Sequence, residues 1–81
     1  MIIDIRSAGE FEKNHVRGAV NVSFAKLIIK PENYLSKNCE AKIICARGVK
    51  SAEVVKILSK KGYKVKNISG GYQSQAYNSC N

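Results

Sequence analysis

The fold is decided by the stretch Lys42-Ile43-Ile44-Cys45-Ala46-Arg47-Gly48-Val49-Lys50-Ser51. Its first four residues form a compact apolar run, which predicts a buried central β-strand that ends at Cys45. A short loop that contains Gly48 follows, and Ser51 is a natural N-cap for a helix. Glu53 then falls in the first turn, where the helix dipole favours negative charge. We therefore predict a strand, a tight loop and a helix in direct succession.

The segments on either side continue this alternation. Strands are predicted over residues 1–5, 19–22 and 63–68, and further helices over residues 7–14 and 23–29. The expected helix signals are the capping-box pair Ser7 and Glu10, the breakers Gly18 and Pro31, the apolar face of Ala52, Val54, Val55, Ile57 and Leu58, and Gly62 after the third helix. Strands that alternate with helices predict an α/β fold with an open, mostly parallel sheet flanked by helices.

Length and composition predict one compact domain over residues 1–81. The chain has 81 residues, of which 44% are hydrophobic. Uncharged apolar runs such as residues 27–29 are far shorter than the ~18 residues that a membrane span needs. The N-terminus carries no basic, apolar or cleavage pattern of a secretory signal. We therefore expect a cytoplasmic protein without membrane contact.

The charge is strongly basic. Fourteen Lys and Arg residues stand against six acidic ones, giving a net charge of +8. Such a balance favours anionic partners, which are small oxyanions, acidic proteins or nucleic acid, although a solvated lysine-rich surface would explain it equally well. Nucleic-acid binding is disfavoured, because the lysines are not interleaved with stacking aromatic residues.

The predicted loop gives Cys45 the surroundings of a reactive thiol. Ligands in open α/β sheets sit beyond the carboxyl ends of strands, and Cys45 occupies such an end. The amides of the loop and of the next helix N-terminus would stabilise a thiolate there, and Arg47 and Lys50 would add positive charge. The alternative is that Cys45 is a small buried hydrophobe that ends a core strand.

Four blocks of sequence resemble the rhodanese family. They are Ile3-Asp4-Ile5-Arg6, the segment from Phe11 through His15 and Gly18 to Val22, the loop from Cys45 to Ser51, and Ser69-Gly70-Gly71-Tyr72. The resemblance implies that Cys45 takes a sulfane sulfur from thiosulfate or a persulfide donor, without a cofactor or a metal. It also implies that the loop Ala46, Arg47, Gly48, Val49, Lys50 and Ser51 holds the persulfide until a thiol or cyanide acceptor removes it.

Two alternatives to this enzyme remain. One is a weakly active or non-catalytic rhodanese-like module that carries sulfur or docks acidic proteins through its lysines. The other is a phosphatase or arsenate reductase, which the loop disfavours. Those relatives have one more residue before an essential arginine, whereas here Lys50 is followed by Ser51.

The chain also departs from the family pattern. Lys50 stands where arginine is usual and offers only a point charge. Gln75 stands at the spacing of a usual tryptophan, with Tyr72 and Tyr77 nearby. The family's first strand and helix have no counterpart before Ile3, so the strand over residues 63–68 is expected to have an open edge, and homodimerisation through that edge is a hypothesis.

Other candidate residues are assigned supporting roles. Asp4 and Arg6 are expected to form a structural ion pair that braces the loop. His15 is expected to be a packed, hydrogen-bonded residue, because no second metal ligand stands at zinc-site spacing. The odd number of cysteines and their wide spacing argue against a disulfide framework. Cys39 is interpreted as buried filler, and Cys80 as an incidental exposed cysteine, with a resolving thiol as the alternative for Cys80.

Overall fold

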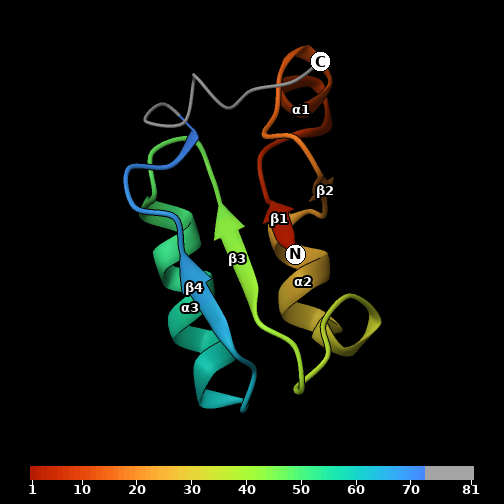
Figure 1. The fold of residues 1–81 in the computed structure, drawn as a ribbon, viewed down its shortest axis with the longest axis vertical. Coiled ribbons are helices and arrows are strands. Elements are labelled where there is room, and N and C mark those ends of the chain that lie inside the picture. Colours follow the sequence, from red (N-terminus) through yellow and green to blue (C-terminus); the bar gives the residue numbers. More distant parts are fainter. Residues whose placement is uncertain (73–81) are drawn as a thin grey trace.

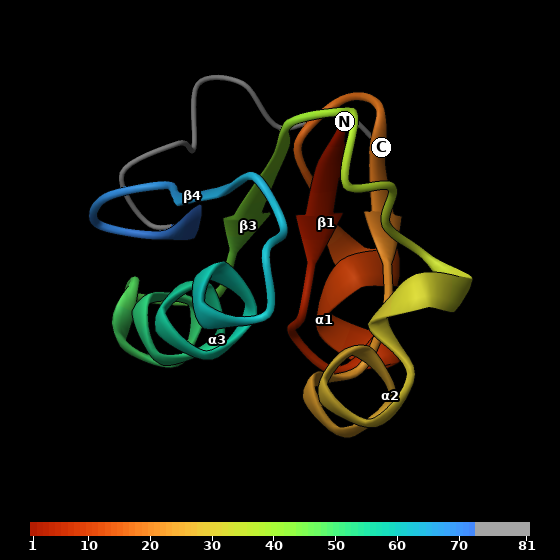
Figure 2. The same ribbon diagram turned by 90° about the horizontal axis from the view of Figure 1, so that it is seen from below.

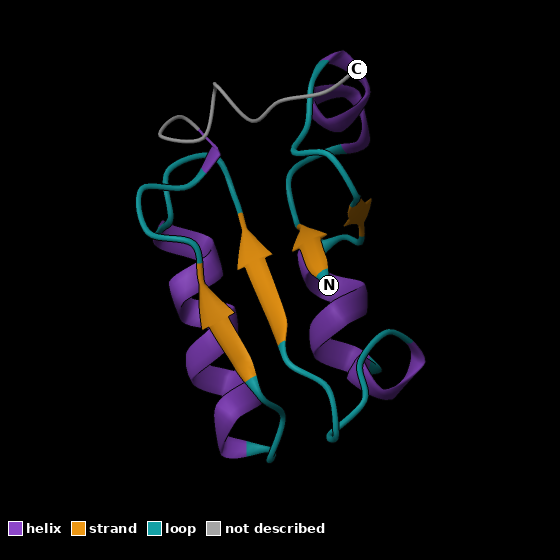
Figure 3. Cartoon of the chain, in the orientation of Figure 1, coloured by secondary structure: helices purple, strands orange, loops and turns teal. Residues whose placement is uncertain are grey.

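The computed structural model describes residues 1–72, which form a parallel sheet packed against helices (Figures 1 and 3). Its strands are β1 (Ile2–Asp4), β2 (Ala19–Asn21), β3 (Ala41–Ile44) and β4 (Val65–Asn67). Their order across the sheet is β2-β1-β3-β4, and each neighbouring pair is parallel. The α/β class and the parallel sheet predicted from the sequence are therefore confirmed.

The helices are α1 (Ala8–Lys13), α2 (Phe24–Ile29) and α3 (Val49–Lys60), with a 3-10 turn at Pro31–Asn33. Figure 2 shows α2 and α3 on the same face of the sheet, and Figure 1 shows α1 beyond the carboxyl end of β1. The core lies between the sheet and helices α2 and α3 and includes Ile3, Ile43, Leu27, Val54 and Leu58. None of the helices in this part of the chain is long and apolar enough to cross a membrane.

The predicted helix signals at the N-terminal half are confirmed. The Ser7 side chain accepts a hydrogen bond from the Glu10 amide, and the Glu10 carboxylate accepts one from the Ser7 amide, which completes the capping box. Ser23 caps α2 in the same way through the Lys26 amide. Pro31 ends α2 by starting the 3-10 turn.

The start of α3 differs from the prediction. The N-cap is Gly48 and not Ser51, and the helix begins at Val49. Gly48 adopts φ +89°, a left-handed conformation that glycine tolerates, so the chain turns into the helix earlier than a serine cap would allow. Ser51 therefore lies buried inside the first turn, and Glu53 lies beyond it.

The buried face of α3 is narrower than predicted. Val54 and Leu58 are buried, Val55 and Ile57 are half-buried, and Ala52 is exposed. The helix ends as predicted, because Gly62 follows the C-cap residue Lys61 with φ +94°.

At the sheet edge, β4 has one partner within the described residues. Its pairing with a second copy of the chain stays a prediction.

We predict that Leu27→Ala lowers the free energy of unfolding by about 2–5 kcal/mol, because the leucine is fully buried in the core and its loss leaves a cavity. Ile29→Ala removes the same number of carbon atoms from the same helix, but this side chain is 74% exposed, so the change should stay within about 0.5 kcal/mol. Urea unfolding followed by circular dichroism measures both. Equal destabilisation by the two variants would contradict the packing of α2.

Candidate active site at Cys45

Cys45 lies directly after β3, where its sulfur faces the first turn of α3. The residue is 6% exposed. The backbone amide of Gly48 lies 3.1 Å from Sγ and that of Ser51 lies 3.3 Å away, and both donate hydrogen bonds to the sulfur. The Ser51 hydroxyl lies 3.2 Å from Sγ. The loop predicted to surround Cys45 therefore does so with backbone amides, as a nest for negative charge requires.

These contacts favour the ionised form of the sulfur. Burial by itself raises the pKa of the Cys45 thiol, but hydrogen bonds from the Ser51 side chain and from the amides of Ser51, Gly48 and Arg47 outweigh it. The net pKa lies below the ordinary value of a thiol. The charges of Arg47 and Lys50, which the sequence analysis expected to contribute, are not among the causes. Hydrogen bonding to the charged form therefore accounts for the lowered pKa.

Asn67, which the sequence analysis missed, controls the Ser51 hydroxyl. It lies at the end of β4, where Oδ1 accepts a hydrogen bond from Ser51 Oγ and Nδ2 donates to the Gly48 carbonyl at 3.3 Å. Because serine has one hydroxyl proton, Asn67 Oδ1 and the Cys45 thiolate compete for it. Asn67 thus joins the loop, the first turn of α3 and β4. A polar residue at the carboxyl end of a predicted parallel strand was the available signal.

The turn at Gly70-Gly71 supports the loop from behind. Gly71 has φ +67°, and a Cβ atom there would lie 2.5 Å from the Cys45 carbonyl oxygen and 2.6 Å from the Gly48 nitrogen. The amide of Tyr72 donates to that same carbonyl at 2.7 Å. Only a glycine allows this approach of two backbones. The Gly70-Gly71 turn, one of the four sequence blocks that resemble the family, therefore packs directly against the Cys45 loop.

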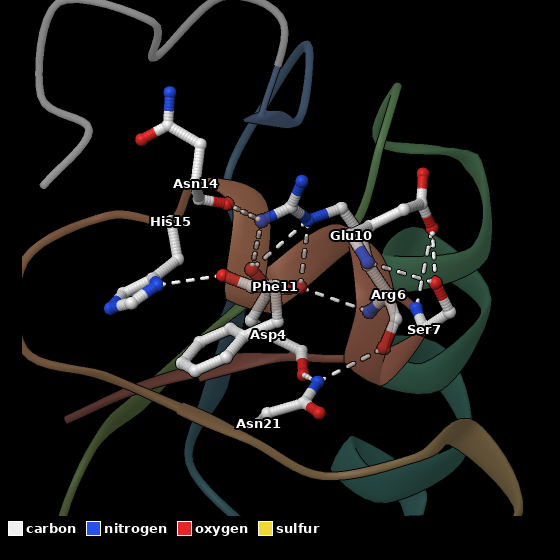
Figure 4. Close-up of polar contacts among 8 residues, drawn as sticks. All are labelled: Asp4, Arg6, Ser7, Glu10, Phe11, Asn14, His15 and Asn21. Atoms are coloured by element: carbon white, nitrogen blue, oxygen red, sulfur yellow. Dashed lines mark hydrogen bonds and ion pairs between the residues drawn. The ribbon is translucent and has the colours of Figure 1, made fainter. Parts of the chain in front are cut away.

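Asp4 and Arg6 form the predicted ion pair, and Figure 4 shows their contacts. Arg6 Nη2 lies 2.8 Å from Asp4 Oδ2 and 2.6 Å from the Asn14 carbonyl oxygen, while the guanidinium carbon lies 4.0 Å from the centre of the Tyr72 ring. Asn21 Nδ2 donates to the carbonyls of Asp4 and Arg6. Arg6 thus links the end of β1 to α1 and to the residue after the Gly-Gly turn, which is the role of a brace.

A pocket of about 390 Å³ opens over Cys45. Of the predicted loop residues, Ala46, Arg47, Val49 and Lys50 line it, whereas Gly48 and Ser51 lie behind the sulfur. Its opposite wall is formed by residues from Ile5 to Glu10. Lys50 Nζ lies 6.0 Å from the centre of the Phe24 ring, and Val49 is 73% exposed at the rim. The pocket therefore leads from the surface to Cys45.

The remaining candidates lie apart from this pocket. His15 Nδ1 lies 2.8 Å from the Phe11 carbonyl oxygen and its ring stacks on Phe11, so it packs as predicted (Figure 4). Cys39 is exposed before the start of β3, so its interpretation as buried filler is wrong, whereas Cys45 follows β3 and is buried. Within residues 1–72, no three His, Cys, Asp or Glu side chains are grouped to hold a metal. Gln75, Tyr77 and Cys80 lie outside the described residues.

Comparison with known proteins connects this geometry to a family. The chain is 35% identical over 63 residues to YrkF, a putative sulfur carrier protein of Bacillus subtilis, covering 78% of this chain and 34% of YrkF. It is 29% identical over 75 residues to PspE, a thiosulfate sulfurtransferase of Escherichia coli, covering 91% of this chain and 72% of PspE. The chain thus spans about a third of the first relative and nearly three quarters of the second.

A solved structure agrees with the sequence relatives. The crystal structure of a rhodanese-like domain protein from Staphylococcus aureus matches with a TM-score of 0.81 and 32% identity, over 90% of this chain and 71% of that one. The sequence model of the rhodanese-like domain family matches residues 1–76, which include Cys45, its loop and the Gly-Gly turn. The chain therefore belongs to the rhodanese-like domain family.

Proposed function

We propose that the chain is a sulfurtransferase that carries sulfane sulfur as a persulfide on Cys45. The observation that carries this proposal is the set of hydrogen bonds from Gly48, Ser51 and the Ser51 hydroxyl to one sulfur atom beneath an open pocket. Thiosulfate or a persulfide is the proposed donor, and a thiol or cyanide is the proposed acceptor. The names of the relatives PspE and YrkF support sulfur transfer or carriage.

The proposed reaction has two nucleophilic steps. The Cys45 thiolate attacks the sulfane sulfur of thiosulfate, a new S–S bond forms, and sulfite leaves with the electron pair of the bond that breaks. The acceptor thiolate or cyanide then attacks the distal sulfur of the persulfide, and the electron pair returns to Cys45. The hydrogen bonds to Sγ lower the pKa of Cys45, so the proposed mechanism uses the thiolate without a separate base.

The loop amides stabilise the charge that moves during these steps. In the persulfide, negative charge lies on the distal sulfur, which enters the pocket above the N-terminus of α3. Preorganised amide donors stabilise such charge without reorganisation of solvent. Lys50 and Arg47 on the pocket wall attract an anionic donor. Lysine offers a point charge rather than a bidentate contact, so binding of thiosulfate should be weak.

A sulfur-carrier function is the second candidate, because YrkF is named a putative sulfur carrier protein. In that function the chain would pass its persulfide to an acidic protein rather than turn over small thiols. Val49, 73% exposed at the rim of the pocket beside Arg47 and Lys50, would contact that partner. The two candidates share the loading step and differ in the second step. In the predicted cytoplasmic setting, small thiols would be available to either.

We predict that incubation with thiosulfate adds one sulfur atom, about 32 Da, to the protein, and that Cys45→Ser abolishes the adduct. Intact-mass spectrometry measures the gain. Cys39→Ser is the matched control, because it removes an exposed thiol at the other end of β3 and should leave the adduct unchanged. A wild-type protein that gains no sulfur from thiosulfate or from a small persulfide donor would exclude both the enzyme and the carrier. Loading without turnover toward cyanide would favour the carrier.

We predict that Ser51→Ala raises the pKa of Cys45, because the variant removes a hydrogen bond that lowers this pKa. The thiolate fraction rises as the pH passes the pKa, so the midpoint of the iodoacetamide alkylation rate should move to higher pH. Ser59→Ala is the control, because it makes the same chemical change at an exposed position of α3. An unchanged midpoint in the Ser51 variant would show that its hydroxyl stays with Asn67 in both ionisation states.

A further inference from the structure

The two walls of the Cys45 pocket carry opposite charges. Arg47 and Lys50 line one wall, and Arg6 and Glu10 line the other. The charge of Arg6 is neutralised by its ion pair with the buried Asp4. Glu10 has no ion pair within residues 1–72. The pocket therefore presents a carboxylate on one side of the sulfur and cationic side chains on the other.

The capping box holds this carboxylate in place. Glu10 Oε1 lies 3.3 Å from the Ser7 nitrogen and 3.0 Å from Ser7 Oγ, and both groups donate to it. Figure 4 shows these two contacts, which fix the side chain against the start of α1. Within the described part of the chain, Oε2 has no recorded hydrogen-bond partner. Glu10 is exposed to solvent, so a ligand in the pocket can reach this second oxygen.

We propose that Glu10 is a specificity-determining residue that selects, as sulfur acceptors, small thiols carrying both an ammonium group and a carboxylate. This inference rests on the proposed function. The ammonium group would lie against Glu10 and the carboxylate against Arg47 and Lys50, with the thiol directed at the sulfur between them. A volume of about 390 Å³ lies in the range of small-ligand pockets.

The transfer step balances without an oxidant or a metal. The acceptor thiol loses its proton to solvent, and its thiolate attacks the distal sulfur of the Cys45 persulfide. The bond between that sulfur and Sγ breaks, and its electron pair returns to Sγ as a thiolate. The acceptor leaves as a persulfide anion, so two negative charges are present before and after the step.

The Glu10 carboxylate should favour the zwitterionic acceptor but disfavour thiosulfate, the proposed sulfur donor. Thiosulfate is a dianion without an ammonium group, so Glu10 repels it as it enters the pocket. Glu10 should therefore slow the loading of Cys45 by thiosulfate and speed the transfer of sulfur from Cys45 to a zwitterionic thiol. A purely structural role of Glu10 in the capping box predicts no such opposite effects.

The test compares Glu10→Gln with the wild-type protein, because glutamine keeps the capping-box hydrogen bond and loses the charge. Cys45 is loaded with thiosulfate, excess donor is removed, and the single-turnover release of sulfur is measured with free cysteine and with N-acetylcysteine. N-acetylcysteine keeps the carboxylate and lacks the ammonium group. We expect the rate ratio of cysteine to N-acetylcysteine to fall about two- to five-fold in Glu10→Gln, as loss of an exposed ion pair predicts. Loading by thiosulfate should become faster by a similar factor.

Glu53→Gln is the matched control, because this exposed glutamate on α3 does not line the pocket and should leave the ratio unchanged. The difference between the two proteins should shrink at high salt, because salt screens exposed charges. A variant that still loads sulfur from thiosulfate is shown to be folded. A ratio that Glu10→Gln leaves unchanged at low salt would overturn the inference. Absence of any persulfide would instead overturn the proposed function, so the two failures are distinguishable.

Discussion

The hydrogen bonds from the Gly48 and Ser51 amides to Cys45 Sγ are the constraint on which the rest of the site depends. Both amides reach one atom only because the loop closes over the sulfur, and that closure needs the left-handed conformation of Gly48. A thiol buried without these donors would have a raised pKa. The same turn of backbone thus sets the start of α3 and the ionisation of the nucleophile.

The loop keeps this shape because the end of β4 and the turn after it pack against it. Asn67 bonds to Ser51 and to the Gly48 carbonyl, Gly71 approaches the Cys45 carbonyl, and Tyr72 donates to that carbonyl. Arg6 then stacks on the Tyr72 ring while paired with Asp4. The ends of three parallel strands are therefore held together around one sulfur atom. Such a preorganised frame suits a reaction in which charge moves between two neighbouring sulfur atoms.

The groups that lower the pKa of Cys45 differ from the charged side chains that line the pocket. Backbone amides and a hydroxyl lower the pKa of the nucleophile, so the side chains of Arg47, Lys50 and Glu10 are left to interact with ligands. Arg6 does not belong to this set, because its guanidinium is paired with Asp4 and donates to the Asn14 carbonyl. Under the proposed function, substitution of pocket charges would change which donors and acceptors are used without altering the bonds that hold Cys45.

Local sequence by itself determined the α/β class, the strand that leads into Cys45, although β3 ends one residue earlier than predicted, at Ile44, the capping box of Ser7 and Glu10, and the end of α3 before Gly62. Each depends on residues within a few positions of one another, where periodicity and capping chemistry act. The chemistry of the two side chains predicted the pairing of Asp4 with Arg6, and the family resemblance pointed to the Gly-Gly turn. Tertiary structure alone decided that Gly48, and not Ser51, caps α3, because the loop must fold over the sulfur. It also decided that Asn67 meets Ser51 and that Glu10 and Arg47 line the same pocket. These residues are far apart in sequence, and the order of parallel strands brings them to the same end of the sheet.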